Sequence, residues 1–144
     1  MDVITALAEK LAKHPELEWI REDQWLRVDA PRPDGFAVEL RHEGGEWTAY
    51  LGSGGWHQHF DDPEEPLNFI AWCYSGEARV REVWRGSWPQ KAILEARENG
   101  GWRSVSETGL IFAPFWRKRR EVVSENPNLL ANSASGCQQT LPPR

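Results

Sequence analysis

The first residues of the chain alternate apolar and polar side chains with the period of a helix. The apolar residues fall on one stripe at a 3.6-residue repeat. They are Ile4, Leu7, Ala8 and Leu11. Asp2 is placed to cap the start of this helix, and Pro15 limits its end. The pattern predicts an amphipathic helix whose apolar side is covered by the rest of the chain.

Strict alternation follows and predicts a first hairpin. With Glu22 and Asp23 as its turn, Trp19 lies across from Leu26 on an apolar face. The same pairing puts two further apolar side chains opposite each other on the face that is otherwise polar. These two are Ile20 and Trp25.

A second hairpin is predicted around Gly44 and Gly45, because such turns need the positive φ that glycine allows. Its apolar face pairs Leu40 with Ala49 and Val38 with Leu51. Trp47 joins this face beside His42. The opposite face is polar, as in an antiparallel sheet with one solvated side.

Residues 63–76 interrupt the strands and predict a central helix. Asp62 and Glu65 have the spacing of a capping box, and Gly76 is a natural helix stop. Apolar residues occur all around the predicted helix, so we expect it to be buried against the sheet.

Two more strands are predicted over residues 78–85 and 91–97, followed by the hairpin signal Asn99-Gly100. A two-residue turn would place Trp102 opposite Arg97 on the outer face, whereas a three-residue bulged loop would turn it inward beside Ala96. Both arrangements remain open. The apolar run 110–116 predicts a last strand, which Pro114 makes an edge or bent one.

Together these elements predict an α+β domain over residues 1–125. It contains an antiparallel β-sheet of about seven to nine short strands in hairpins and meanders, covered on one face by the N-terminal and central helices. Residues 126–144 are rich in Asn, Ser, Gln and Pro, which predicts a disordered C-terminal tail.

Composition narrows the classes of function. The chain has 144 residues, 40% hydrophobic and 27% charged, with a net charge of −5, which fits one globular domain. A negative surface repels nucleic acids and anionic membranes. With no long apolar stretch and no signal peptide, we expect a cytoplasmic protein without a membrane partner. Cys73 and Cys137 are too few for a disulfide framework, so we expect free thiols.

A metal site is the first candidate for chemistry, because two histidines at i and i+2 of a strand point to the same side. His57, His59 and Glu64 partly resemble the first metal motif of cupins, and His57, His59 and Asp61 partly resemble the motif of metallo-β-lactamases. Leu51 replaces the leading glycine of cupins, and Asp62 replaces a histidine of the other family. We therefore expect a strand followed by an acidic helix start, with no metal or other cofactor.

A basic run beside aromatic residues is the second candidate. Phe115 and Trp116 precede four consecutive cations, Arg117 to Arg120, and an arginine-rich strand at residues 79–85 could reinforce them. Such mixtures bind single-stranded nucleic acid, but four charges after a strand also make a solvated sheet edge. The acidic balance of the chain favours the second interpretation.

The third candidate is an exposed aromatic surface. Most of the nine tryptophans are expected in the core. Trp25 on a polar face and Trp88 in a loop are the exceptions, and clustered exposed aromatics mark partner surfaces. The candidate partner-binding residues are Ile20, Trp25, Trp88, Trp116, Arg117 and Arg119.

These observations favour a non-catalytic protein-binding or accessory protein, of a chaperone-like or immunity type. The order of helix, strands, helix and strands loosely resembles that of type III secretion chaperones. The alternatives are a small-ligand or metal-dependent enzyme with a pocket near His57 and His59, and a protein that binds single-stranded nucleic acid through Trp116 and Arg117 to Arg120. No motif of nucleophilic catalysis or phosphate binding is present, so no catalytic residue is assigned.

Overall fold

The computed structural model describes residues 2–52, 55–109 and 114–129. In this part of the chain it contains two helices and nine strands. Their order is α1 (Val3–Leu11), β1 (Trp19–Arg21), β2 (Trp25–Val28), β3 (Val38–Glu43), β4 (Glu46–Leu51), β5 (Trp56–Phe60), α2 (Glu65–Cys73), β6 (Ala78–Arg85), β7 (Trp88–Glu98), β8 (Gly101–Gly109) and β9 (Arg119–Glu125).

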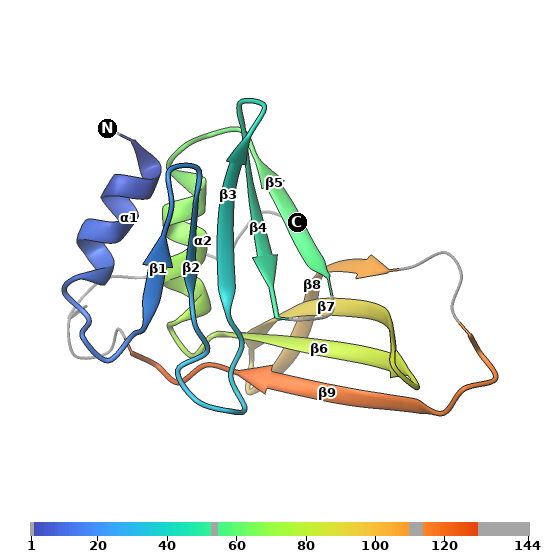
Figure 1. The fold of residues 1–144 in the computed structure, drawn as a ribbon. Helices are drawn as coiled ribbons and strands as arrows, with labels where there is room; N and C mark the ends of the chain where they lie inside the picture. The colour runs from blue at the N-terminus through green and yellow to red at the C-terminus, as the bar shows by residue number, and fades with distance from the viewer. Residues whose placement is uncertain (1, 53–54, 110–113, 130–144) are drawn as a thin grey trace.

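The strands form two antiparallel sheets, where the sequence predicts one. β1 to β5 make a five-stranded meander, and the second sheet has the order β8-β7-β6-β9. Figure 1 shows the first sheet upright and the longer strands of the second sheet running across its lower end. A hydrogen bond from Trp56 Nε1 to Ser106 Oγ, 2.9 Å long, joins β5 to β8 where the sheets meet. The predicted α+β class with antiparallel sheets is confirmed.

Both helices pack on the same face of the first sheet (Figure 1), as the sequence predicts. The buried face of α1 includes Ile4, Leu7 and Leu11, in agreement with its apolar stripe. From α2, Phe69 stacks on the fully buried Trp56 of β5 with ring centroids 5.7 Å apart. The core lies between the helices and the meander and extends to the second sheet, where Val80, Leu94 and Val105 belong to the same buried cluster. Neither helix of the described residues is long and apolar enough to cross a membrane.

The helix ends agree only in part with the predictions. The Asp2 carboxylate accepts a hydrogen bond from the Thr5 N–H at 3.1 Å and caps α1 as expected. The predicted capping box at α2 is wrong. The N-cap residue is Glu64, and its side chain makes no capping hydrogen bond. Asp62 instead accepts from the Glu64 N–H at 2.9 Å, in a turn before the helix.

The first hairpin is shifted by two residues from its predicted register. A hydrogen bond from the Glu22 N–H to the Trp25 carbonyl, 2.8 Å long, closes the turn one residue later than expected. Trp19 therefore pairs with Val28, and Ile20 pairs with Arg27 instead of Trp25. Because an even shift preserves the two faces of a strand, Trp19 still packs against the core.

The other two predicted hairpins form with the turns that the sequence indicates. β3 and β4 pair in the predicted register, and His42 stacks on Trp47 with a centroid distance of 4.0 Å. At the third hairpin Asn99 and Gly100 have φ of 51° and 78°, and Arg97 pairs with Trp102. The two-residue turn is therefore the one formed, and Trp102 lies on the outer face.

The end of the described chain differs from its prediction. Residues 110–113 lie outside the described residues, and Phe115 and Trp116 lie in a turn closed by a 2.9 Å bond from the Arg117 N–H to the Pro114 carbonyl. The edge strand is β9, which pairs with β6. Asn126, where the sequence places the start of a tail, is buried. Residues 130–144 of that predicted tail lie outside the described residues.

Candidate partner-binding site

Two turns lie side by side at one end of the second sheet. The Gly86 N–H, in the turn between β6 and β7, donates to the Lys118 carbonyl at 3.0 Å. Gly86 has a φ of 60°, and a Cβ there would lie 3.0 Å from Cδ of Arg117. Glycine therefore allows both the turn and the close approach of the basic segment. We call this surface the tip; it comprises Arg85, Trp88 and residues 115–120.

Three aromatic side chains of the tip face solvent. Phe115 is 79% exposed, Trp116 73% and Trp88 51%. Phe115 and Trp116 contact each other edge to face, with ring centroids 5.3 Å apart. Large aromatic rings are normally buried, and those left exposed together are common anchors of protein interfaces.

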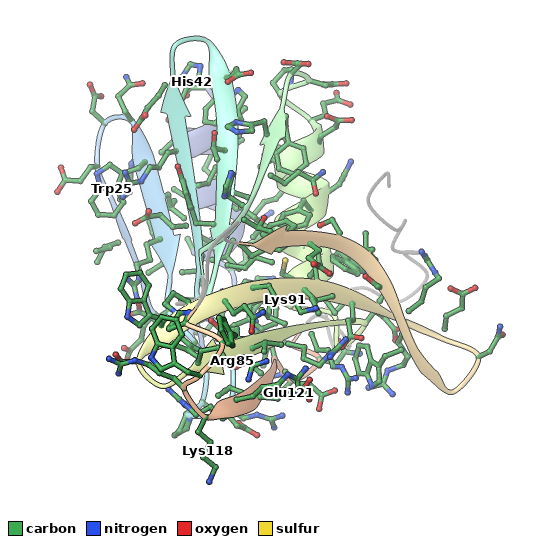
Figure 2. All side chains as sticks on the ribbon, turned by 90° about the vertical axis from the view of Figure 1, so that its right-hand side faces the viewer. Trp25, His42, Arg85, Lys91, Lys118 and Glu121 are labelled. Atoms are coloured by element: carbon green, nitrogen blue, oxygen red, sulfur yellow. The ribbon has the colours of Figure 1, made fainter. Side chains whose placement is uncertain are left out.

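The tip contains five cations and no carboxylate; Figure 2 labels two of these cations, Arg85 and Lys118. Arg119 donates to the Glu121 carboxylate at 2.9 Å, and Arg120 lies over the Trp84 ring at 5.1 Å. Hydrogen bonds from Arg119, and next from Arg81, lower the pKa of Glu121. Within the described residues, neither Arg117 nor Lys118 forms an ion pair. The tip is therefore a local basic patch on a chain of net charge −5.

The arginines of β6 do not extend this patch along the sheet, as the sequence suggested they could. Arg79 and Arg81 both lie beside the buried Glu95, at 2.8 and 3.4 Å. Arg81 also pairs with Glu121 at 3.0 Å. Carboxylates thus neutralise the outer face of the second sheet, and the uncompensated charge stays at the tip.

The six predicted partner-binding residues fall into two separate groups. Trp88, Trp116, Arg117 and Arg119 come together at the tip. The other two lie on the outer face of the first sheet, where Ile20 is 56% exposed and Trp25 is half-buried opposite Arg41. The pairing of Ile20 with Trp25 that suggested a joint surface is wrong, because the first hairpin has a different register.

The candidate metal ligands are only partly brought together. His57 and His59 point to the same outer face of β5, with ring centroids 5.6 Å apart. Nδ1 of His59 lies 2.9 Å from Thr48 Oγ1 and 3.6 Å from a Glu46 oxygen. Glu64 stands at the start of α2, which packs on the opposite face of the sheet. The described residues contain no group of three or more His, Cys, Asp or Glu side chains that could hold a metal ion.

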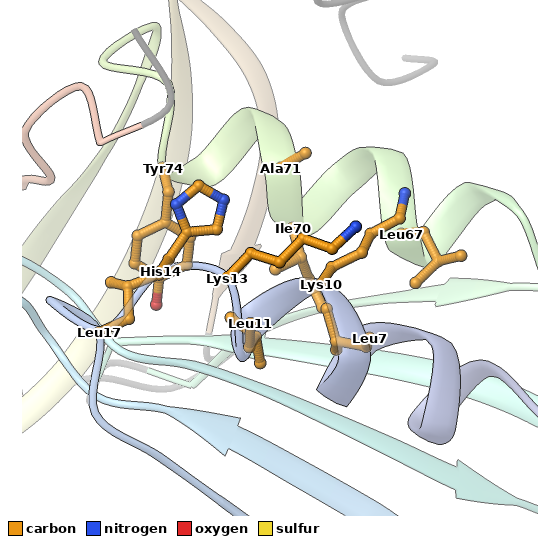
Figure 3. A pocket seen from close by; sticks show the side chains of 10 residues that line it. All are labelled: Leu7, Lys10, Leu11, Lys13, His14, Leu17, Leu67, Ile70, Ala71 and Tyr74. Atoms are coloured by element: carbon orange, nitrogen blue, oxygen red, sulfur yellow. The ribbon is translucent and has the colours of Figure 1, made fainter. Parts of the chain in front are cut away.

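A cavity of about 260 Å³ opens between α1 and α2 (Figure 3), away from His57 and His59. Its floor is apolar, and Lys10, Lys13 and His14 line its rim. The sequence analysis did not predict this cavity. The available signal was that apolar residues occur all around the predicted helix at residues 63–76.

Cys73 is the one cysteine among the described residues, and its surroundings do not activate the thiol. Cys73 is fully buried at the end of α2, and burial raises the pKa of its thiol well above the ordinary value. This agrees with an inert core thiol. Cys137 lies outside the described residues.

Comparisons with known proteins do not indicate a function for the tip or the cavity. No protein-family model matches the chain, and neither a curated protein nor a solved structure is significantly similar to it.

Proposed function

We propose that this chain is a non-catalytic binding protein that holds a partner protein through the tip. The observation that carries the proposal is the exposure of Trp88, Phe115 and Trp116 beside Arg117 and Lys118, two cations without an ion pair in the part of the chain that the structure describes. Tryptophan and arginine are the side chains that most often dominate the affinity of protein interfaces. A chaperone-like or immunity-type role in the cytoplasm is consistent with this arrangement.

The chemistry of the tip defines the surface it would bind. Aromatic rings gain most from apolar pockets, while a basic rim favours carboxylates around such a pocket. The partner is therefore a protein with an acidic surface that surrounds an apolar depression. Because the rest of this chain is acidic, such a partner would be guided to the tip and repelled elsewhere.

A protein partner is favoured over single-stranded nucleic acid. Nucleic acid needs a basic groove that follows the phosphate backbone over several nucleotides. Here Glu95 and Glu121 neutralise Arg79 and Arg81, so positive charge does not continue along the sheet. A compact tip suits one anchored contact better than an extended chain of phosphates.

Affinity capture from a lysate of the cells that make the protein tests the proposal. The wild type is compared with F115A/W116A and with R117E/K118E, and Val123→Ala serves as the matched control because Val123 is also an exposed apolar residue of β9. We expect one protein captured by the wild type and the control, and lost with both tip variants.

A parallel titration with RNA and single-stranded DNA at two salt concentrations separates the two classes of partner. Protein capture that depends on the tip, without nucleic-acid binding, supports the proposal. Salt-dependent nucleic-acid binding that both tip variants abolish would replace it with the nucleic-acid function. Capture that is equal for all variants would refute any role of the tip.

A further inference from the structure

The cavity between α1 and α2 has a lining that separates apolar and charged groups. Its floor and walls come from Leu7, Leu11, Ile70 and Tyr74, among other apolar residues. The Tyr74 hydroxyl donates to the Val28 carbonyl at 3.3 Å, so this hydroxyl is already paired within the fold. The interior of the cavity therefore favours a ligand whose buried part is purely hydrocarbon.

Besides Tyr74, the ionisable groups that line the cavity are Lys10, Lys13 and His14. Figure 3 shows Lys10 and Lys13 of the N-terminal segment side by side above the apolar floor, with His14 beyond them over Tyr74. Nδ1 of His14 lies 3.4 Å from a Glu16 carboxylate oxygen, so this ring already has an acidic neighbour. Within the described residues neither lysine forms an ion pair, and no carboxylate belongs to the lining. An anionic group at the rim would therefore meet two free ammonium groups.

We propose that this cavity binds a free medium-chain fatty acid, with the alkyl chain on the apolar floor and the carboxylate between Lys10 and Lys13. A volume of about 260 Å³ is below the range of pockets for drug-sized ligands and suits a single short hydrocarbon chain. Burial of each methylene stabilises the complex, and the exposed ion pairs at the rim set the orientation of the ligand.

Two other occupants fit the cavity less well. An amphipathic helix of another protein places several anchor side chains in a longer groove. The chain's own residues 130–144 contain one arginine and no aspartate or glutamate, so their side chains do not complement two lysines. Charge and size together favour a small anionic amphiphile.

Calorimetric titration of the full-length protein with decanoate, below the concentration at which it forms micelles, tests the proposal. We expect one binding site in the wild type, and affinity about tenfold weaker in K10Q/K13Q, since each exposed ion pair contributes little by itself. Lys91→Gln in β7 removes one lysine far from the cavity and is expected to bind decanoate as the wild type does.

Decanol separates the role of charge from the integrity of the cavity. The neutral alcohol should bind wild type and K10Q/K13Q equally, and Ala71→Phe, which fills the cavity, should block both ligands. Amide chemical shifts induced by decanoate should map to Leu7, Leu11 and Ala71. The proposal is overturned if decanoate shows no saturable binding, if K10Q/K13Q binds it as tightly as the wild type, or if the shifts lie elsewhere. Binding of an acidic helical peptide without binding of decanoate would overturn it in favour of a protein ligand.

Discussion

The side chain of Asn126 pairs with the backbone of Phe36, a residue 90 positions earlier, as a neighbouring strand would. Asn126 Oδ1 accepts from the Phe36 N–H at 2.8 Å, and its Nδ2 donates to the Phe36 carbonyl at 3.1 Å. A third bond, 3.3 Å long, runs from Nδ2 to the Cys73 carbonyl at the end of α2. One buried amide, directly after β9, thus joins the segment before β3 to the end of α2.

Replacing Asn126 with alanine should destabilise the protein by about 2–4 kcal/mol, because two backbone groups of Phe36 lose their partner in a buried place. Urea unfolding followed by fluorescence measures this change. Asn68→Ala on the exposed side of α2 is the matched control, with an expected effect within about 0.5 kcal/mol. A cost below about 1 kcal/mol for Asn126→Ala would show that this amide is not a structural joint.

Gly35 lies against the same amide, and this leads to a second prediction. A Cβ at Gly35 would lie 2.6 Å from Asn126 Oδ1, whereas at Gly101 the nearest atom would be 3.9 Å away. Gly35→Ala should therefore cost about 1–3 kcal/mol, and the control Gly101→Ala much less. If the clash is the cause, Gly35→Ala should cost less when Asn126 is already alanine, and a double-mutant cycle measures that difference. Equal costs in both backgrounds would reject this cause.

Glu121 should contribute to the dependence of stability on pH. Hydrogen bonds from Arg119 and Arg81 lower the pKa of this carboxyl group in the folded protein below its ordinary value. Its stabilising effect is therefore present above the pKa of the unfolded chain and is lost as the pH falls through the lower folded pKa. The difference in unfolding free energy between wild type and Glu121→Gln should be constant near pH 7 and fall toward acid pH. A difference that is independent of pH would contradict the pairing.

Cys73 should react with thiol reagents only after unfolding. Burial raises the pKa of its thiol, so little thiolate forms in the folded protein at neutral pH, and reagents cannot reach it. Cys137→Ser leaves Cys73 as the one thiol of the chain. In this variant a disulfide reagent should label the folded protein slowly and the urea-unfolded protein at once. Rapid labelling without urea would mean that α2 opens readily.

Alternation along the chain predicts which side chains share a face better than it predicts which are paired. Trp47 and His42 were placed together correctly because glycines fix the turn between β3 and β4. The first hairpin lacks such a signal, and an even shift of register leaves every residue on its face, so Ile20 was paired wrongly. The position of Trp102 depends instead on the turn type, because a three-residue loop would turn this side chain to the other face of the sheet.

Features that depend on distant segments could not be predicted. β9 is a mostly polar edge strand, and its position is set by its pairing with β6. The prediction of a strand at Phe115 and Trp116 is wrong, because an apolar run without alternation does not distinguish a strand from a turn. The tip needs the turn at Gly86 beside Lys118, and the cavity needs Leu7 near Ile70. The residues of both sites were visible in the sequence, but their neighbours were not.

Site-specific photo-cross-linking tests the central claim most directly. p-Benzoylphenylalanine incorporated at position 116 in the tip is compared, in the cells that make the protein, with the same group at position 123 on β9. We predict one protein adduct at position 116 that is absent at position 123 and disappears when Arg117 and Lys118 are changed to glutamate. No protein adduct at position 116, or the same adducts at both positions, would contradict a partner-binding role for the tip.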